Sequence, residues 1–333
     1  MILVTGGTGL IGSHLLFELA LRGHNVKALK RKTSNTGFTQ KIFEGYSSEG
    51  KQLFEKVEWV EGQTEDYISI RAALNGVSEV YHCAAIVSFG KRSFNQMLEV
   101  NVQGTANVVD ASLEQGVKKF CHVSSVASLG RSFDEKEVTE QTTWGKTKGK
   151  SGYAISKFRS EMEVWRGIEL GLNATIVNPS VILGPGKWDS GSGQIFGTLE
   201  KGFPFYTAGI TGYVDVRDVV DSMLKAMELE QWGKRFIING QNISHGEVFA
   251  LIAKELGNKP PRIRVTPLMA AIAWRLVWLV SQVTRKTPAL TSDTAKSGNS
   301  VTYYSSERMQ KELGIKPRSV ERAIKNTIRF GRL

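Results

Sequence analysis

The glycine-rich stretch TGGTGLIG at residues 5–12 most constrains the fold, because it separates the apolar run MILVT from an amphipathic, helix-like run. Gly7, Gly9 and Gly12 form a G-x-G-x-x-G pattern, and Gly6 begins an overlapping G-x-x-G-x-x-G pattern. Glycine allows a sharp turn and lets a pyrophosphate approach the backbone N–H groups at a helix N-terminus. The position between a strand and a helix is the context that such a turn requires. The stretch therefore predicts a dinucleotide-binding turn.

Strand-like and helix-like runs alternate up to about residue 180, which predicts βαβ units and a parallel sheet. We expect a Rossmann-type, doubly wound α/β fold with its ligand at the carboxyl ends of the strands. The polar segment 30–56 has no clean period, and we expect it to be mostly loop. The expected strands are 1–5, 25–29, 57–62, 78–85, 118–125 and 173–180, and the clearest helices lie near 93–115 and 153–170.

The pattern changes after Gly184, where a glycine-rich loop leads into a mostly helical region with one further strand, KRFIING at 234–240. We therefore expect a dinucleotide-binding domain over residues 1–183. A smaller, mostly helical substrate lobe should occupy residues 184–333, with part of 214–240 returning to the main sheet.

The most apolar segment is LMAAIAWRLVWLVSQV at 268–283, which spans 16 residues with Arg275 in its middle. It is too short and too charged for a comfortable membrane span, so we expect no integral membrane segment. A buried helix is the simplest interpretation. A wall for a hydrophobic substrate and a contact with a membrane surface are the alternatives.

Composition narrows the partners and the compartment. The formal net charge is +11, from 43 cations and 32 acids, which permits attraction to anions but is also consistent with a simply basic surface. We expect no nucleic-acid partner. Cys83 and Cys121 lie far apart in apolar runs, as is typical of buried thiols in a reducing, cytoplasmic protein. The five histidines show no metal-binding spacing, so no metal site is expected; His82 and His122 should be satisfied core residues.

The run YAISK contains Tyr153 and Lys157, whose four-residue spacing places both side chains on one face of a helix. A phenol with a pKa near 10 is a poor acid–base catalyst at neutral pH. A neighbouring ammonium and an oxidised nicotinamide would favour the phenolate and lower that pKa. The serines of SSVAS, at the end of the fifth strand, could hydrogen-bond a substrate oxygen.

Six motifs follow one another in an order that resembles a known family. They are TGGTGLIG, HCAA at 82–85, NVQGTANV at 101–108, HVSSVASLG at 122–130, YAISK, and NPSVILGPG at 178–186. The layout is similar to that of the extended short-chain dehydrogenase/reductase superfamily, in its NAD-dependent epimerase/dehydratase group, and most resembles the dihydroflavonol-4-reductase-like branch. The resemblance is strong over residues 1–230 and rests only on position and helical character beyond them.

The resemblance implies catalytic roles. Tyr153 would be the general acid–base residue, and Lys157 would lower its pKa and hold the nicotinamide ribose. The catalytic serine falls on Ser125, with Ser124 as the alternative. Asn101 would organise a proton-relay water.

The resemblance also implies cofactor and substrate contacts. The predicted cofactor contacts are Gly6, Gly9, Leu10, Ile11, Gly12, Arg31, Lys32, Gln63, Ala84, Ala85, Tyr153, Lys157, Pro179 and Ser180. Gln63 replaces the aspartate that family members use for the adenine amine, although its side-chain carbonyl could accept the same bond. Phe89, Trp188 and Tyr206 lie where the family lines its substrate pocket, and each could equally be core. Asp215 and Arg217 are as consistent with a structural role as with substrate binding.

The run VKALKRK at 26–32 bears on the choice of cofactor. An acid at the end of the second strand would bind the ribose 2′-hydroxyl of NAD, whereas this chain has Arg31 and Lys32 there and no carboxylate between Val26 and Lys41. Arg31 aligns with the family's phosphate-binding position, and Lys32 or Ser34 could add a second contact. NADP(H) is therefore the preferred cofactor and NAD(H) a possible one; the alternative is a solvated basic loop.

Together these features predict an NADP(H)-dependent oxidoreductase that reduces a ketone or an aldehyde, or oxidises the alcohol. One alternative is a nucleotide-sugar epimerase or dehydratase with tightly bound NAD(P), and another is a non-catalytic dinucleotide-sensing protein. The expected partner is a small-molecule carbonyl or sugar substrate, and a homodimer is compatible with the sequence. The sequence does not identify the substrate.

Overall fold

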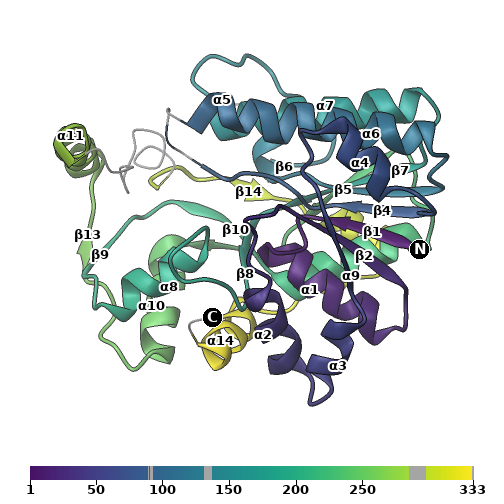
Figure 1. Ribbon diagram of the computed structural model, residues 1–333. Helices are drawn as coiled ribbons and strands as arrows, with labels where there is room; N and C mark the ends of the chain where they lie inside the picture. Colours follow the sequence, from purple (N-terminus) through teal and green to yellow (C-terminus); the bar gives the residue numbers. More distant parts are fainter. Residues whose placement is uncertain (89, 91–92, 131–136, 285–297, 332–333) are drawn as a thin grey trace.

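The computed structural model describes residues 1–88, 90, 93–130, 137–284 and 298–331. Its centre is a seven-stranded sheet, parallel throughout, in the order β11-β7-β5-β4-β1-β2-β3 (Figure 1). The chain adds β2 and β3 on one side of β1 and the later strands on the other side, so the order reverses between β1 and β4. This is the expected doubly wound Rossmann-like sheet. The strands are β1 (Ile2–Thr5), β2 (Val26–Lys30), β3 (Glu58–Glu61), β4 (Glu79–His82), β5 (Lys119–Val123), β7 (Ala174–Pro179) and β11 (Lys234–Ile238).

Helices cover both faces of the sheet, because each central strand buries apolar side chains in both directions. In β1, Ile2 and Val4 join one hydrophobic cluster and Leu3 joins the other. The first cluster lies under α1 (Leu10–Leu21), α2 (Gly37–Tyr46), α3 (Gly50–Glu55) and α9 (Val216–Glu228). The second lies under α4 (Tyr67–Ala73), α6 (Gly104–Glu114) and α7 (Gly152–Glu169), which Figure 1 shows together above the sheet.

The segment 30–56 is not mostly loop, and that prediction was wrong. It contains α2 and α3, and the buried face of α2 consists of Phe38, Thr39, Ile42 and Phe43. This face packs on α1, where the Phe17 and Phe43 rings meet edge to face at 5.5 Å between centroids. The helical spacing of these apolar residues was present in the sequence but was obscured by the polar residues between them.

The helix expected near 93–115 is present but changes its winding. An α-helical turn, α5 (Phe94–Met97), leads into the π-helical segment Leu98–Gln103 and then into α6. Such segments place one extra residue in a turn and are frequent at functional sites. A short 3₁₀ turn, Val126–Ser128, follows β5.

The remaining elements form a second region, which packs beside the carboxyl edge of the sheet and contains more strands than expected. Its core surrounds Trp188, Phe196, Tyr213, Ile252 and Ile324. The elements are β8 (Val181–Leu183), β10 (Ile210–Asp215) and β12 (Gln241–Ser244) in one sheet, β9 (Phe205–Tyr206) with β13 (Ile263–Arg264), β6 (Glu137–Val138) with β14 (Tyr303–Tyr304), and the helices α8 (Gly193–Glu200), α10 (His245–Glu255), α13 (Glu307–Leu313) and α14 (Val320–Phe330). The strand at 234–240 is β11, the edge strand of the main sheet.

The apolar segment 268–283 forms α11 (Pro267–Thr284), but the prediction of a buried helix was wrong for its first turns. Leu268, Met269 and Ile272 are 71%, 40% and 53% exposed, whereas Ala270 is buried. Figure 1 shows α11 projecting from the second region, beyond β13. Within the described residues, no helix combines the length and the apolar character needed to cross a bilayer.

Candidate functional site

The glycine-rich turn is shaped by two close backbone approaches. Gly6 has φ +71°, and a Cβ there would lie 2.7 Å from the Ala84 nitrogen; a Cβ on Gly12 would lie 2.2 Å from the Gly6 carbonyl oxygen. No side chain caps α1 at Gly9, and its first turn, which holds Leu10 and Ile11, contains no acid. The exposed N–H groups and the absence of negative charge fit a bound pyrophosphate.

Thr5 and His82 fix the ends of β1 and β4 beside this turn. The Thr5 hydroxyl lies 2.7 Å from His82 Nδ1 and accepts a bond from the Ala84 N–H at 3.3 Å, while His82 Nε2 lies 3.0 Å from the Thr105 hydroxyl. His82 is therefore a satisfied core residue, and burial lowers its pKa to about 3. Ala84 is half-buried and Ala85 exposed at the carboxyl edge, next to Gly6.

His122 was also expected to be a satisfied core histidine, and in this the structure differs from the prediction. It is buried and stacks on His82 at 5.2 Å between ring centroids, but neither ring nitrogen has a hydrogen-bond partner in the described part of the chain. Burial holds its pKa well below the ordinary value, so the ring is neutral.

Arg31 and Lys32 lie at the carboxyl end of β2, where both side chains are exposed. Neither forms an ion pair with any residue that the structure describes, whereas Lys30 pairs with Glu61 at 3.7 Å. Gln63 follows β3 at the same edge, and the Ser69 hydroxyl holds its backbone in both directions, at 3.1 Å and 3.0 Å. The two cations are thus available to an anion at this edge.

Ser125 and Tyr153 meet at the end of β5. The Ser125 oxygen accepts the Ala127 N–H at 3.1 Å, and its side chain is hydrogen-bonded to the Tyr153 hydroxyl. Because the serine oxygen already accepts a bond, its own proton can be donated to Tyr153. The Ser124 hydroxyl instead donates to Glu161 at 2.6 Å. The geometry therefore favours Ser125 over Ser124 as the partner of Tyr153.

Lys157 lies one helical turn after Tyr153 and is buried. Its ammonium donates to the Val123 carbonyl at 2.8 Å, and burial lowers its pKa to about 8, against the opposing effects of Glu161 and Cys83. The expected lowering of the Tyr153 pKa by Lys157 is not present in the protein alone. Burial raises the pKa of Tyr153, and the hydrogen bond from Ser125 opposes that rise.

Glu161, one turn beyond Lys157, is a residue that the sequence analysis missed. It is 1% exposed and lies beside Arg235 at 3.1 Å. Its Oε2 accepts bonds from Ser124, Ser128 and Asn178, and its Oε1 accepts bonds from Arg235 and Trp165. The carboxylate therefore ties α7 to the turn that carries Ser125. The continued four-residue spacing, Tyr153–Lys157–Glu161, was the available signal.

Asn101 lies in the π-helical segment and is buried. Its Oδ1 accepts the Ile86 N–H at 2.7 Å, and its Nδ2 donates to the Ile86 carbonyl at 3.0 Å and to Ser156 at 3.1 Å. Both amide protons are therefore engaged in joining the segment after β4 to α7. The side chain positions this segment, and the structure gives it no direct contact with Tyr153.

Pro179 and Ser180 lie at the end of β7, beside Ser125 and its turn. The Ser180 hydroxyl and the Asn239 Oδ1 are buried and have no hydrogen-bond partner among the described residues. A Cβ on Gly212 would lie 2.2 Å from Asn239 Oδ1 and 2.8 Å from Ser180 Cβ, which shows that these groups converge. Both atoms are enclosed by the fold, next to Gly212.

Two of the residues expected to line the substrate pocket, Trp188 and Tyr206, lie within the described part of the chain. Trp188 is 9% exposed and packs on Phe196 at 5.7 Å, inside the core of the second region. Tyr206 lies in β9 against Gly246. Phe89 is outside the described residues. Asp215 caps α9 and pairs with Arg217 at 2.5 Å, a structural arrangement.

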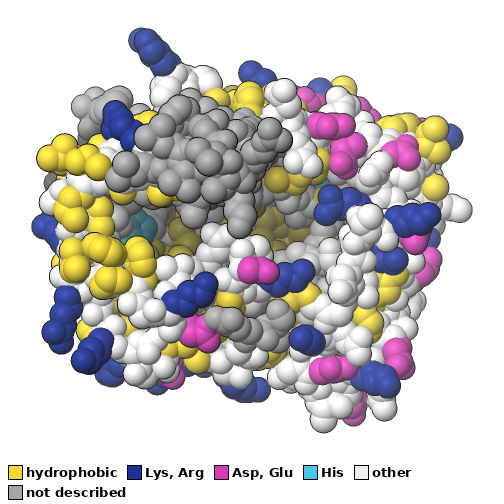
Figure 2. All heavy atoms as spheres, turned by 60° about the vertical axis from the view of Figure 1, so that its left-hand side comes forward, with side chains coloured by type: hydrophobic (Ala, Val, Ile, Leu, Met, Phe, Trp, Pro, Cys, Tyr) yellow, Lys and Arg dark blue, Asp and Glu magenta, His cyan; other side chains and the backbone are white. Residues whose placement is uncertain are grey.

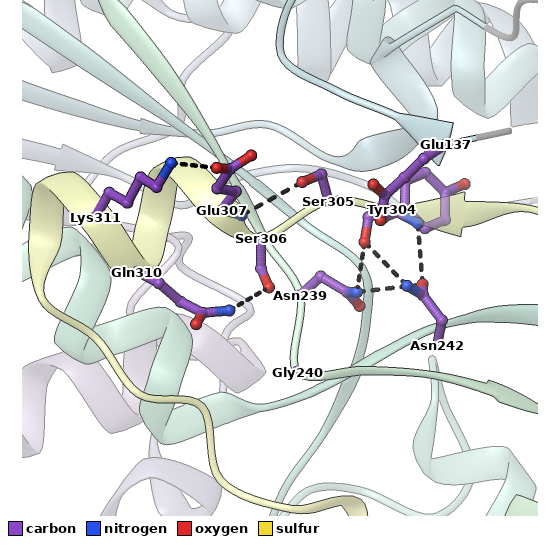
Figure 3. A pocket seen from close by; sticks show the side chains of 10 residues that line it. All are labelled: Glu137, Asn239, Gly240, Asn242, Tyr304, Ser305, Ser306, Glu307, Gln310 and Lys311. Carbon is purple, nitrogen blue, oxygen red and sulfur yellow. Dashed lines mark hydrogen bonds and ion pairs between the residues drawn. The ribbon is translucent and has the colours of Figure 1, made fainter. Parts of the chain in front are cut away.

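A polar pocket of about 340 Å³ lies beside β11 and α13, and Figure 3 shows the side chains that line it. Asn239 and Asn242 each donate to the Tyr304 carbonyl at 3.0 Å, so these amides join β14 to the end of β11 and to β12. The pocket is lined by Glu137, Asn239, Gly240, Asn242, Tyr304, Ser305, Ser306, Glu307, Gln310 and Lys311, and none of these is a predicted site residue. In the described chain, no three His, Cys, Asp or Glu side chains gather as metal ligands, and both cysteines are free thiols.

The sequence matches the NAD dependent epimerase/dehydratase family over residues 2–239. The chain belongs to this family. It is an NAD(P)-dependent oxidoreductase of the extended short-chain dehydrogenase/reductase superfamily, as the motif order indicated.

Individual relatives agree with this assignment over nearly the whole chain. Sterol demethylase protein B from Methylococcus capsulatus is 30% identical and covers 99% of this chain and 98% of its own length. A putative dihydroflavonol 4-reductase from Synechocystis sp. is 27% identical over 98% of this chain and 93% of its own. The solved structure of gox2253 has a TM-score of 0.82 at 31% identity, with 100% and 99% of the two chains covered.

Proposed function

We propose that this family member reduces a ketone or an aldehyde with NADPH, or oxidises the corresponding alcohol, through Ser125, Tyr153 and Lys157. The observation that carries the proposal is the hydrogen bond between Ser125 and Tyr153, with Lys157 buried one turn away. A hydroxyl pair at the carboxyl edge of the sheet can hold a carbonyl oxygen and give it a proton.

Each of these three side chains would have a separate role in the reaction. Ser125 steadies the substrate oxygen, and Tyr153 transfers a proton to it. Lys157, whose pKa is lowered to about 8, would hold the nicotinamide ribose and support the phenolate left on Tyr153. Bound NADPH supplies the hydride. Pro179 and Ser180, at the end of β7, would flank the ring.

The cofactor preference rests on Arg31 and Lys32. Both are exposed at the end of β2, and neither is neutralised by a described acid. The guanidinium of Arg31 suits bidentate recognition of a 2′-phosphate, which an acid at this position would repel. The glycine turn and the uncapped start of α1 fit the pyrophosphate of either dinucleotide.

The test is a panel of ketones and aldehydes assayed by the loss of NADPH absorbance, with NADH in parallel. We expect stoichiometric NADPH oxidation with at least one carbonyl compound, and a kcat/KM for NADPH about 10² higher than for NADH. Equal values for both cofactors would refute the preference. No carbonyl-dependent oxidation with either cofactor across the panel would refute the reductase assignment.

The family description also names epimerases and dehydratases, so a nucleotide-sugar epimerase or dehydratase is the second candidate. Such an enzyme regenerates its cofactor in each turnover. It would retain NAD(P) through purification and convert a nucleotide sugar without consuming free NADPH. Measuring bound dinucleotide in the purified protein separates the two functions.

A further inference from the structure

The first turns of α11 and the adjoining β9–β13 ribbon form an exposed apolar surface. Leu268, Met269 and Ile272 occupy one side of α11 at positions i, i+1 and i+4, and are 40% to 71% exposed. In the ribbon, Phe203 and Ile263 are each 44% exposed. These five residues make up the α11 surface. Figure 2 shows hydrophobic side chains gathered at one edge of this side of the molecule.

The segments that carry the α11 surface are joined to one another. The Ile263 N–H donates to the Pro204 carbonyl at 3.0 Å, which joins the segment of Phe203 to β13. Five residues after Ile263 the chain reaches Leu268, and the Met269 N–H is bonded to the Thr266 hydroxyl at 3.3 Å at the start of the helix. Apolar area of this kind, gathered in one place, usually marks an interaction site.

Cations without matching acids surround this surface. Residues 256–284 contain four cations and no acid. Lys259, Arg262, Arg264 and Arg275 are exposed, and none of them forms an ion pair within the described residues. Figure 2 shows Lys and Arg side chains beside and below the apolar patch. The occupant of this surface must therefore carry negative charge next to an apolar phase.

We propose that the α11 surface docks on the surface of a membrane that contains anionic lipids. An interfacial helix presents apolar side chains to the acyl boundary and surrounds them with Lys and Arg that face the headgroups. The membrane surface supplies a partner for both features, an apolar boundary for the exposed side chains and anionic headgroups for the cations. The helix lies on the bilayer in this arrangement and does not cross it.

The proposal is independent of the catalytic assignment and needs no substrate for its test. The purified full chain is mixed with vesicles of phosphatidylcholine alone, or of phosphatidylcholine with phosphatidylglycerol, and floated through a density gradient. We expect binding to the anionic vesicles at least tenfold tighter than to the neutral ones. Failure of the wild-type chain to float with anionic vesicles would overturn the proposal.

Two variants and their matched controls locate the contact. Ile272→Asp should weaken vesicle binding by about tenfold or more, because it places an acid among the apolar contacts. Ile68→Asp, at a 78% exposed position on α4, should leave binding unchanged. Equal losses of vesicle binding in the two variants would show that the binding is nonspecific and would overturn the proposal.

The charge contribution is tested in the same way. Replacing Arg262 and Arg264 together by glutamine should weaken binding to anionic vesicles by roughly thirtyfold. The exposed pair of Lys51 on α3 and Lys56 directly after it, changed to glutamine, provides the control and should have a much smaller effect. Light scattering of the free protein completes the test: a dimer that Ile272→Asp dissociates would show that a second copy covers the surface, and would also overturn the proposal.

Discussion

Replacing Glu161 by glutamine removes a buried negative charge on which five donors converge. Glutamine has the size of glutamate, but an NH2 group replaces one of the two carboxylate oxygens. This hydrogen-bond donor would then face other donors. The five donors come from Ser124, Ser128, Trp165, Asn178 and Arg235. At least one buried donor therefore loses its acceptor, and the guanidinium of Arg235 loses its counter-charge.

The size of the effect follows from these contacts. Removing one partner of a buried ion pair costs about 3–5 kcal/mol. Arg235 is 19% exposed in its side chain and keeps bonds to the Glu140 and Thr142 carbonyls, so part of its charge remains satisfied. We therefore expect the free energy of unfolding to fall by about 3 kcal/mol, which for a chain of this size lowers the melting temperature by roughly 4 °C.

Urea unfolding monitored by circular dichroism measures this change, and steady-state kinetics measures its effect on the Ser125 turn. The kcat of Glu161→Gln should fall by about tenfold or more, because the turn loses its tie to α7. Glu163→Gln is the control: its partner Arg166 is 39% exposed, and the loss of that pair should cost less than about 1 kcal/mol. An unfolding midpoint for Glu161→Gln equal to that of the wild type would refute the reasoning.

Three further predictions follow from the site and the core. Tyr153→Phe should keep the fold and cofactor affinity while kcat falls on the order of 10² or more; unchanged turnover would exclude Tyr153 as the proton donor. Arg31→Ala should remove most of the preference for NADPH in a binding titration and leave NADH affinity nearly unchanged. Burial lowers the pKa of His14 to about 4 and of His82 to about 3. The unfolded chain therefore binds more protons below pH 6.5, and the free energy of unfolding should fall by about 2 kcal/mol per histidine between pH 7 and pH 5; urea midpoints that stay constant over this range would contradict the pKa shifts.

The parts of the fold that could be predicted have a local cause. Consecutive residues predict the strand, glycine turn and helix at the N-terminus. They also predict the alternation of strands and helices up to β7. Tyr153 and Lys157 share a face because a helix returns every 3.6 residues. The family assignment rests on the same consecutive motifs, and the match over residues 2–239 confirmed it.

The predictions that were wrong depended on packing partners distant in sequence. In segment 30–56 the helical spacing of the apolar residues was present, but the contact of Phe43 with Phe17 on α1, which buries that face, joins residues distant in sequence. For α11 the apolar run predicted a helix, but the burial of that helix depends on whether another element covers it. Ile272 is 53% exposed because no described element does.

Within the site, the order of residue types supplies the chemical groups, whereas the assembled fold sets how each group is used. Ser124 and Ser125 are neighbours of the same type, yet one bonds Glu161 and the other Tyr153, because the 3₁₀ turn after β5 points their hydroxyls in different directions. The sign of the Tyr153 pKa shift was decided in the same way. Burial by surrounding elements outweighs the hydrogen bond from Ser125, and burial is a property of the assembled fold that no spacing of residues encodes.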